Sequence, residues 1–379
     1  MDTSLATTED RGSAVGVGII GAGNVLWAYL QVLDRLVPRG LAWEGPIHAH
    51  RHDTWPDIMG RRPGVALVDD ARQVLDSDVS VVVIITPPDT HASYARAALE
   101  AGKHVVCEKP VGMSRAEAEP VFELAASRGL HLLAAPFVQL SPTFRELWTR
   151  VRQGEIGPVH SARGLYGNPG STWSAWFHDG GVGPLAEAGV YNLKSLTALL
   201  GPVTEVYAAD GLAVPVREVG DRRIEHPDPD VSQVILRHTD GALSAVTSGQ
   251  AVQRYRRPGL ELYGTDGTAN LLGDDWDPTG IEIWRNRDAA WTCIDPADAT
   301  WLWADGLREA VVAIIEDREP LTNAEHDLHL LEVIDAARVS ASEHRPVQVT
   351  SAFGPLDLGV ELGGARHHLH DHTRPADEQ

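Results

Sequence analysis

An apolar run that ends in two closely spaced glycines constrains this chain more than any other feature. Residues 15–20 have the composition of a buried parallel strand. Gly21 and Gly23 follow at once, and apolar residues then recur at helical spacing through residues 26–36. A strand, a glycine-rich turn and a helix in this order form the opening of a dinucleotide-binding unit. The N-terminal part is therefore predicted to be an α/β domain.

Strand and helix patterns alternate after this opening, which is typical of a doubly wound parallel sheet. Beyond about residue 137 the pattern changes to strands joined by short turns, which predicts an α+β domain with a large, mainly antiparallel sheet. Strands are expected near residues 47–50, 80–88, 104–110, 231–238, 242–250, 260–264 and 269–273. Helices are expected near residues 91–101, 114–128, 142–153, 184–200, 304–317 and 323–342.

These patterns divide the 379 residues into four parts. A polar, flexible leader is expected at residues 1–13 and an NAD(P)-binding domain at residues 14–136. Residues 137–351 are expected to form the α+β domain. Residues 352–379 are expected to form a polar tail, in which His367, His368, His370 and His372 are interpreted as solvated side chains, with a metal site as the alternative.

Charge and targeting signals limit the partners of this chain. Its formal net charge is −21, which argues against nucleic acid or an anionic membrane surface as the main partner. The N-terminus lacks the apolar segment of a secretory signal, and no apolar run approaches the roughly 18 residues that span a bilayer. The two cysteines exclude a disulfide framework and a multi-cysteine metal site. A cytoplasmic protein without a catalytic metal is expected.

The glycine-rich turn provides the first candidate site. Gly21 would allow the tight turn and Gly23 would let the backbone approach a pyrophosphate at the helix N-terminus, with Asn24 and Val25 beside it. Leu26 occupies the position of the third glycine in the dinucleotide-binding pattern. A plain turn is the alternative interpretation of two glycines, but their place between strand and helix favours a nucleotide.

The end of the second strand bears on the choice of cofactor. The acidic residue that would bind the ribose hydroxyls is not found there, and Arg51 follows the strand instead. A guanidinium suits a 2′-phosphate, so NADP is favoured over NAD, unless Arg51 is only a solvated loop residue. Thr86 and Pro87 end another strand at the same sheet edge. His91 begins the next helix, where it would line the cofactor groove, cap the helix or pack against it.

Two segments carry candidate catalytic residues. Glu108 and Lys109 end a predicted core strand, where open parallel sheets bind their ligands, and Lys109 is one of only three lysines. An ammonium there would polarise a substrate oxygen, although a surface lysine is the alternative. In the helix predicted from Pro184, Glu187, Tyr191 and Lys194 would share one face. They would form a proton-handling set or, alternatively, an ordinary surface network.

Together these motifs resemble the Gfo/Idh/MocA oxidoreductases, named after glucose-fructose oxidoreductase and inositol dehydrogenase. The similar motifs are GAGN after the first strand, TPP with His91, EKPVG, and G-P-L-x-E-x-G-V-Y. The resemblance implies a Rossmann domain that binds NAD(P), with Lys109 beside the nicotinamide. It implies that Tyr191 is the catalytic acid and that Arg51 belongs to a pattern of NADP-accepting members. Glu187 stands where the family usually has Asp.

The resemblance also implies a substrate class and an assembly. Sugars, polyols or cyclitols are expected as substrates, and packing of the second-domain sheets is expected to give a homodimer or homotetramer. A loop before the motif helix offers flat apolar faces and polar groups for a sugar ring, although its tryptophans would serve equally well as core anchors. The substrate-binding candidates are Trp173, Trp176, His178 and Asp179, with Lys194 from the helix.

The sequence thus predicts an NAD(P)-dependent dehydrogenase or reductase that acts on CH–OH groups. In the direction of oxidation, Tyr191, helped by Lys109, would take the hydroxyl proton while the hydride goes to the nicotinamide. Glu187 would orient Tyr191 or the substrate. Two alternatives remain open: a non-catalytic regulator that senses NAD(P), and a hydrolase or epimerase that oxidises its substrate only transiently.

Overall fold

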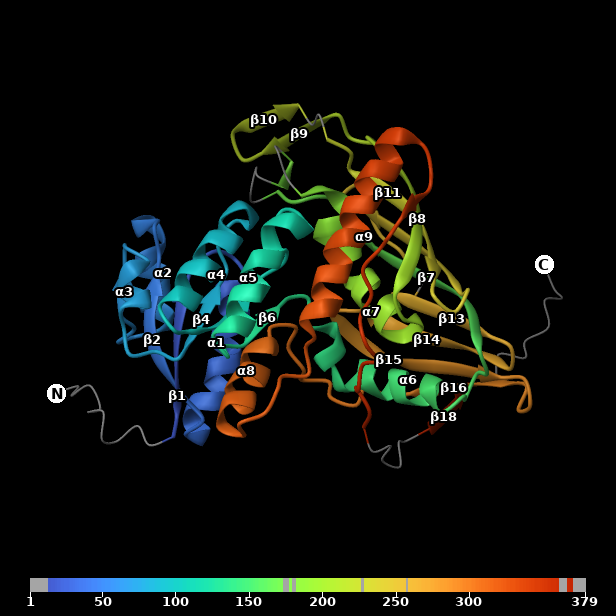
Figure 1. Ribbon diagram of the computed structural model, residues 1–379, viewed down its shortest axis with the longest axis horizontal. Coiled ribbons are helices and arrows are strands. Elements are labelled where there is room, and N and C mark those ends of the chain that lie inside the picture. The colour runs from blue at the N-terminus through green and yellow to red at the C-terminus, as the bar shows by residue number, and fades with distance from the viewer. Residues whose placement is uncertain are drawn as a thin grey trace. The chain divides into compact units, whose positions relative to one another are not determined.

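The computed structural model describes residues 13–172, 177–178, 182–225, 228–256 and 258–360, together with the backbone of residues 367–370. It divides into two compact units (Figure 1). The first unit comprises Met1–Phe137 and Leu302–Asp327, and the second comprises Val138–Trp301 and Leu328–Gln379. Within the described residues, no helix is both long enough and apolar enough to cross a membrane.

The first unit contains a six-stranded parallel sheet in the order β3-β2-β1-β4-β5-β6. All residues of β1 and β4 are buried, as the apolar runs predict. The order of the strands reverses between β1 and β4, which pair through Ile20 and Ile84. The strands are β1 (Val15–Ile20), β2 (Ala42–His48), β3 (Leu67–Val68), β4 (Val81–Ile84), β5 (His104–Cys107) and β6 (Leu132–Ala134). The predicted α/β class and doubly wound order are confirmed.

The helices of the first unit follow the apolar periodicity of the sequence. Helix α1 buries the side chains at the predicted positions on one face, from Leu26 to Leu36. Ser114 caps α5, because its Oγ accepts a hydrogen bond from the backbone N–H of Glu117 at 3.3 Å. The helices are α1 (Leu26–Leu36), α2 (Trp55–Arg61), α3 (Arg72–Leu75), α4 (His91–Glu100), α5 (Arg115–Ser127) and α8 (Gly306–Ile315).

Helix α8 departs from the predicted division of the chain. The sequence places it in the second domain, but it packs against α1 and against strands β1, β4, β5 and β6 (Figure 1). A Cβ atom on Gly306 would lie 2.3 Å from the ring of Phe137, so the glycine permits their close approach. The domain that the sequence predicts at residues 137–351 is therefore interrupted by residues 302–327. The other predicted boundaries stay predictions.

Two histidines of the first unit lie against each other. The rings of His104 and His131 have centroids 4.9 Å apart, and His104 Nδ1 accepts a hydrogen bond from the backbone N–H of His131 at 3.0 Å. Burial, and then the neighbouring His131, lower the pKa of His104 from 6.5 to about 4. His104 is therefore neutral in the folded protein at pH values where it is protonated in an unfolded chain.

This pKa predicts a loss of stability in mild acid. Above pH 6.5 both states leave His104 neutral, whereas between 6.5 and about 4 only the unfolded chain takes up the proton. The free energy of unfolding, measured in urea at pH 7.5 and pH 5, should fall toward pH 5. His104→Asn keeps an acceptor near the Nδ1 position and does not titrate, so this variant should lose less. An equal loss in both proteins would contradict the assignment.

The second unit is built on a ten-stranded, mainly antiparallel sheet, in the order β17-β8-β11-β12-β7-β13-β14-β15-β16-β18. Among the described strand pairs of this second sheet, only β12–β7 is parallel. The strands are β7 (Val159–Gly167), β8 (Val203–Gly211), β11 (Val231–His238), β12 (Leu243–Gly249), β13 (Leu260–Gly264), β14 (Gly267–Asp274), β15 (Asp277–Arg285), β16 (Ala290–Ile294), β17 (Val347–Gln348) and β18 (His367–His370). The predicted α+β domain with a large antiparallel sheet is confirmed.

Helices α6 and α7 pack on this sheet, and a separate hairpin extends from it (Figure 1). Helix α6 contacts β14 and β15, and α7 contacts β7 and β12. Buried and exposed residues alternate along β11, as expected for a sheet that is covered on one face. The remaining elements are α6 (Pro142–Arg152), α7 (Val190–Leu200), α9 (Ala324–Glu343) and the paired strands β9 (Val216–Val219) and β10 (Arg222–Glu225).

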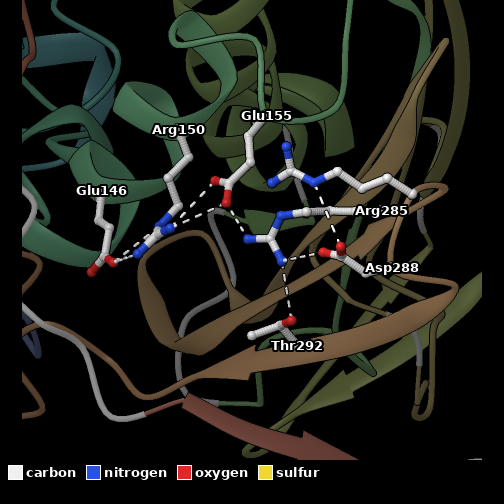
Figure 2. A network of polar contacts seen from close by, with 7 residues as sticks. Glu146, Arg150, Glu155, Arg285, Asp288 and Thr292 are labelled. Carbon is white, nitrogen blue, oxygen red and sulfur yellow. Dashed lines mark hydrogen bonds and ion pairs between the residues drawn. The ribbon is translucent and has the colours of Figure 1, made fainter.

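A chain of ion pairs ties α6 to the edge of the sheet (Figure 2). Arg150 contacts Glu146 within the helix at 2.7 Å and Glu155 after it at 3.3 Å. Glu155 also pairs with Arg285 at the end of β15, and Arg285 donates to Thr292 Oγ1 in β16 at 3.1 Å. Because these charges are largely buried, each needs its partner in place. The network therefore fixes the position of α6 on β15 and β16.

The predicted polar tail is partly wrong. Leu358 is fully buried, and Arg145 donates to the carbonyl oxygens of Leu358 and Gly359 at 3.0 and 2.9 Å. The backbone of residues 367–370 forms β18, which pairs with β16. Leucines two residues apart, at 356 and 358, have the spacing of a half-buried extended segment, and the overall polarity of the tail obscured this signal.

Candidate functional site

The backbone of the turn after β1 requires a glycine at position 21 but not at position 23. Gly21 has a φ of +109°, and a Cβ atom there would lie 2.8 Å from the carbonyl of Ile85, just beyond β4. Gly23 is exposed, and a Cβ atom there would meet no described atom within 4 Å. The protein's own packing therefore explains Gly21 and does not explain Gly23. A ligand that approaches the backbone would explain Gly23.

The N-terminus of α1 lies directly after this turn. Asn24 is exposed, and the N-cap residue Val25 makes no side-chain capping hydrogen bond. Backbone N–H groups at such a helix end favour an anionic ligand. The residues after β1 thus fit the pyrophosphate of a dinucleotide.

His91 connects two loops at the edge of the sheet. Its Nε2 lies 2.7 Å from the carbonyl oxygen of Thr86, and its Nδ1 lies 2.7 Å from that of Pro110. The side chain is buried, and burial lowers the pKa of its imidazole. Of the three roles weighed for His91, the geometry supports packing: the ring joins the loop after β4 to the loop after β5. Pro87, two positions beyond Ile85, is exposed at this edge.

Glu108 and Lys109 follow β5 as predicted. The carboxylate of Glu108 is buried and accepts hydrogen bonds from the Tyr29 hydroxyl at 2.8 Å and from the backbone N–H of Lys109 at 3.2 Å. Tyr29 is itself fully buried in α1 and packs edge-on against Trp303 at 6.0 Å. Glu108 thus holds the backbone at Lys109, whose side chain is half-buried.

The loop after β2 contains an acid that the sequence analysis passed over. Arg51 is exposed and forms an ion pair with Asp53, with Nη2 and Oδ2 2.5 Å apart. Asp53 lies two residues beyond Arg51, in a short 3₁₀ turn, and not at the strand end where an acid was sought. Both a guanidinium and a carboxylate are therefore present near the predicted ribose position.

The motif helix begins differently from the prediction. Residues Leu185–Gly189 form a π-helical turn, and the regular helix α7 starts only at Val190. The wider turn changes the angular relation between Glu187 and Tyr191 from that of a regular α-helix, and their sharing of one face stays a prediction. Gly189 lies against β12, where a Cβ atom would be 2.9 Å from Ser248 Oγ. This close approach accompanies the π turn, and helical spacing alone could not reveal it.

The polar residues of this segment differ in burial. Glu187 and Tyr191 are half-buried, whereas Lys194 is fully buried in α7. The alternative of a surface network is therefore wrong for Lys194. Asn192 is also buried, and it donates to Asp275 Oδ1 at 3.1 Å. Burial raises the pKa of Asp275 to about 7, and the hydrogen bond from Asn192 opposes this rise.

An aromatic group lies beside Tyr191 in the second unit, and Tyr166 is the member that contacts it. The ring of Tyr166, near the end of β7, lies edge-on to Tyr191 with centroids 5.7 Å apart. Tyr166 is also edge-on to Trp276 at 6.3 Å. Nearby, the Tyr255 hydroxyl donates to Asp274 Oδ1 at the end of β14. The sequence analysis missed all four residues, because they are far apart in the chain and follow no local motif.

The loop before the motif is only partly described. Trp173, Trp176 and Asp179 lie outside the described residues. His178 is buried, and its Nε2 lies 2.8 Å from the carbonyl oxygen of Ser171 in the same loop. This contact links the two ends of the described part of the loop through the His178 side chain.

A buried ion pair fixes the start of this loop. Arg217 in β9 donates to the carbonyl oxygen of Pro169 at 2.9 Å and pairs with Asp230 at 3.0 Å. Asp230 also accepts hydrogen bonds from the backbone N–H groups of Ala213 and Val214 at 2.6 and 3.0 Å. The pair therefore connects the β9–β10 hairpin to the chain that leads toward the motif helix.

Metal binding has no support among the residues that can be assessed. In the described parts of the chain, no three His, Cys, Asp or Glu side chains gather as a metal site. The tail histidines His367, His368, His370 and His372 fall where side chains are not described.

Comparison with known proteins decides the family. A model described as "Oxidoreductase family, NAD-binding Rossmann fold" matches residues 15–135, and the "GFO/IDH/MocA C-terminal domain" model matches residues 144–270. The chain belongs to the Gfo/Idh/MocA oxidoreductase family. It is an NAD(P)-dependent oxidoreductase of that family, and the predicted resemblance is confirmed.

Individual relatives of this family member are distant. The uncharacterized oxidoreductase YrbE of Bacillus subtilis is 29% identical over 70% of this chain and 75% of its own length. Trans-1,2-dihydrobenzene-1,2-diol dehydrogenase of Bos taurus is 30% identical over 55% of this chain and 59% of its own. Levoglucosan dehydrogenase, in complex with NADH and levoglucosan, has a TM-score of 0.78 at 20% identity, over 89% of this chain and 99% of its own. At that identity, the structural match shows the fold alone.

Proposed function

We propose that this Gfo/Idh/MocA protein transfers a hydride between a nicotinamide and a CH–OH or C=O carbon of a sugar, polyol or cyclitol. The observation that carries the proposal is the placement of the motif residues. Lys109 lies two residues beyond β5 of the dinucleotide-binding sheet, and Tyr191 lies in the first turn of α7, just after the π-helical turn. Relatives named for a benzene dihydrodiol and for levoglucosan support a neutral substrate with hydroxyl groups.

The residues after β1 are proposed to hold the cofactor. Gly21, Gly23, Asn24 and Val25 would bind its pyrophosphate, and Thr86 and Pro87 would line the groove. His91 and Glu108 would position this edge through the contacts described above. Arg51 would bind a 2′-phosphate in exchange for its contact with Asp53, which favours NADP(H).

The protein's own groups would handle the proton. A bound nicotinamide supplies the hydride acceptor when an alcohol is oxidised. Tyr191 would take the hydroxyl proton as the carbonyl forms, and the Lys109 ammonium would polarise the oxygen and favour the phenolate. Glu187 would orient Tyr191 or the substrate. Trp173, Trp176, His178, Asp179 and Lys194 stay proposed as substrate-side residues, and a homodimer or homotetramer stays the proposed assembly.

A cofactor titration followed by a substrate panel tests this proposal. NADH and NADPH are titrated by fluorescence, and sugars, polyols and cyclitols are then screened at the absorbance of the reduced nicotinamide. Binding with net redox change on a member of the panel is the expected result, with tighter binding of NADPH. Binding without redox change on any of them would favour a sensing regulator. A tightly retained cofactor with product formation but no net NADH release would favour transient oxidation.

Gly23→Ala provides a sharper test of the cofactor site. Since the added methyl group meets no described protein atom, thermal stability without cofactor should not fall, and the lower entropy of the unfolded chain should raise it slightly. Affinity for NAD(P)H should fall by about tenfold or more, because the backbone can no longer approach the pyrophosphate. Gly60→Ala is the matched control: Gly60 is also exposed, has no described atom within 4 Å of a Cβ, and lies in α2. Equal affinity in both variants would argue against this site.

A further inference from the structure

The aromatic group beside Tyr191 has a specific geometry. Tyr166 lies edge-on to Tyr191 with an interplanar angle of 74°, and edge-on to Trp276 with an angle of 72°. Edge-to-face pairs at such centroid distances stabilise one relative orientation of the rings. The Tyr166 ring therefore contacts two other rings, that of Trp276 and that of Tyr191.

The two tyrosines come from different elements of the second unit. Tyr166 lies in β7, paired with Ser248 of β12 in the middle of the sheet. Tyr191 lies at the start of α7, directly after the π-helical turn. The pairing of β7 with β12 fixes the backbone from which the Tyr166 ring reaches Tyr191.

The surroundings of Tyr166 disfavour the ionisation of its phenol. Burial raises the pKa of Tyr166 to about 12, and the carboxylates of Asp274 and Glu187 add to this rise. The Tyr255 hydroxyl holds Asp274 through a hydrogen bond to Oδ1. Tyr166 therefore stays protonated at ordinary pH and is unsuited to be a base.

We propose that Tyr166 is a positioning residue, whose ring fixes the direction of the Tyr191 phenol and whose hydroxyl takes no part in proton transfer. This inference rests on the proposed function of Tyr191. It assigns the ring of Tyr166 to the geometry of the reaction, and it leaves the proton with Tyr191 alone.

Two substitutions at residue 166 separate the ring from the hydroxyl. Tyr166→Phe keeps both edge-to-face contacts, so kcat should stay within about threefold of the wild type. Tyr166→Leu removes the ring, so kcat should fall by about 10- to 100-fold while the Kd for NAD(P)H is unchanged. Tyr207→Phe, on an exposed part of β8, is the matched control. If the Phe variant loses as much as the Leu variant, the hydroxyl acts directly and the proposal is wrong.

NMR of labelled tyrosines tests the positioning role without a measurement of turnover. The chain has seven tyrosines, so labelling their ring carbons gives a simple NMR spectrum in which Tyr191→Phe identifies the Tyr191 signal. That signal should shift or broaden in Tyr166→Leu and stay close to its wild-type position in Tyr166→Phe. If Tyr166→Leu does not fold, Trp276→Leu removes the support behind Tyr166 and should move the same signal.

The kinetic and NMR measurements together distinguish a failure of the proposed function from a failure of the positioning role. If the wild type oxidises no substrate of the panel, the proposed function fails, and the NMR signal still reports whether Tyr166 orients Tyr191. If the wild type is active but neither kcat nor the Tyr191 signal responds to Tyr166→Leu, only the positioning role is overturned.

Discussion

Lys109→Met and Tyr191→Phe are each expected to lower kcat by about 10²–10⁴-fold, the range that general acid–base groups contribute. Methionine keeps the length of the lysine and removes its charge, and phenylalanine keeps the ring and removes the proton-bearing oxygen. Steady-state kinetics on the best substrate of the panel measure the effect. The Kd for NAD(P)H should change much less, because the proposed dinucleotide contacts come mainly from residues 21–25.

Matched controls exist for both substitutions. Lys103→Met changes another half-buried lysine of the first unit, whose Nζ donates to the carbonyl oxygen of Ser77 at 2.7 Å. Tyr207→Phe removes an exposed phenol from β8. Both controls should retain turnover. If Lys109→Met and Tyr191→Phe retain it as well, the proposed roles of these residues are wrong.

The cofactor half of the site was more accessible to prediction than the substrate half. Gly21 and Gly23 lie in one local strand–turn–helix pattern. Such a pattern depends on residues that are neighbours in the sequence, so the sequence reveals it. The ring that contacts Tyr191 comes from β7, and Trp276, which contacts that ring in turn, follows β14. Only tertiary folding brings these segments together, so no spacing in the sequence reports them. Asp53 was missed for a smaller reason: it lies in the turn beyond the strand end.

The fold shows the same division between local and distant effects. Strands β1, β11 and β13 occupy their predicted residues, because burial imposes a clear pattern on each. The π-helical turn was not predicted, because the helical spacing of the motif does not distinguish a π turn from a regular α-helix. The placement of α8 in the first unit was also not predicted, since its apolar face alone does not say which sheet it covers.

Asp230→Ala is expected to lower the free energy of unfolding of the second unit by about 3–5 kcal/mol, the usual cost of leaving a buried charge without its partner. The Asp230 side chain has no solvent exposure, and that of its partner Arg217 is 9% exposed. The substitution also removes the acceptor for the backbone N–H groups of Ala213 and Val214. Denaturant unfolding measures the loss.

Glu343→Ala is the control for this effect. It breaks an arginine–carboxylate pair with Arg345 in which both side chains are at least half exposed, so the expected loss is about 1 kcal/mol or less. Similar losses for the two variants would mean that Asp230 is not held as described. A smaller, conservative change such as Asp230→Asn should fall between them.

The position of α8 sets a condition on how the chain folds as it is made. All six strands of the first sheet leave the ribosome before residue 135, but the helix that packs on four of them ends at Ile315. The nascent first unit must therefore wait, with apolar strand surface uncovered, until most of the protein has been synthesised. A fragment that stops at Phe137 lacks this helix and should therefore unfold at a lower denaturant concentration than the full chain.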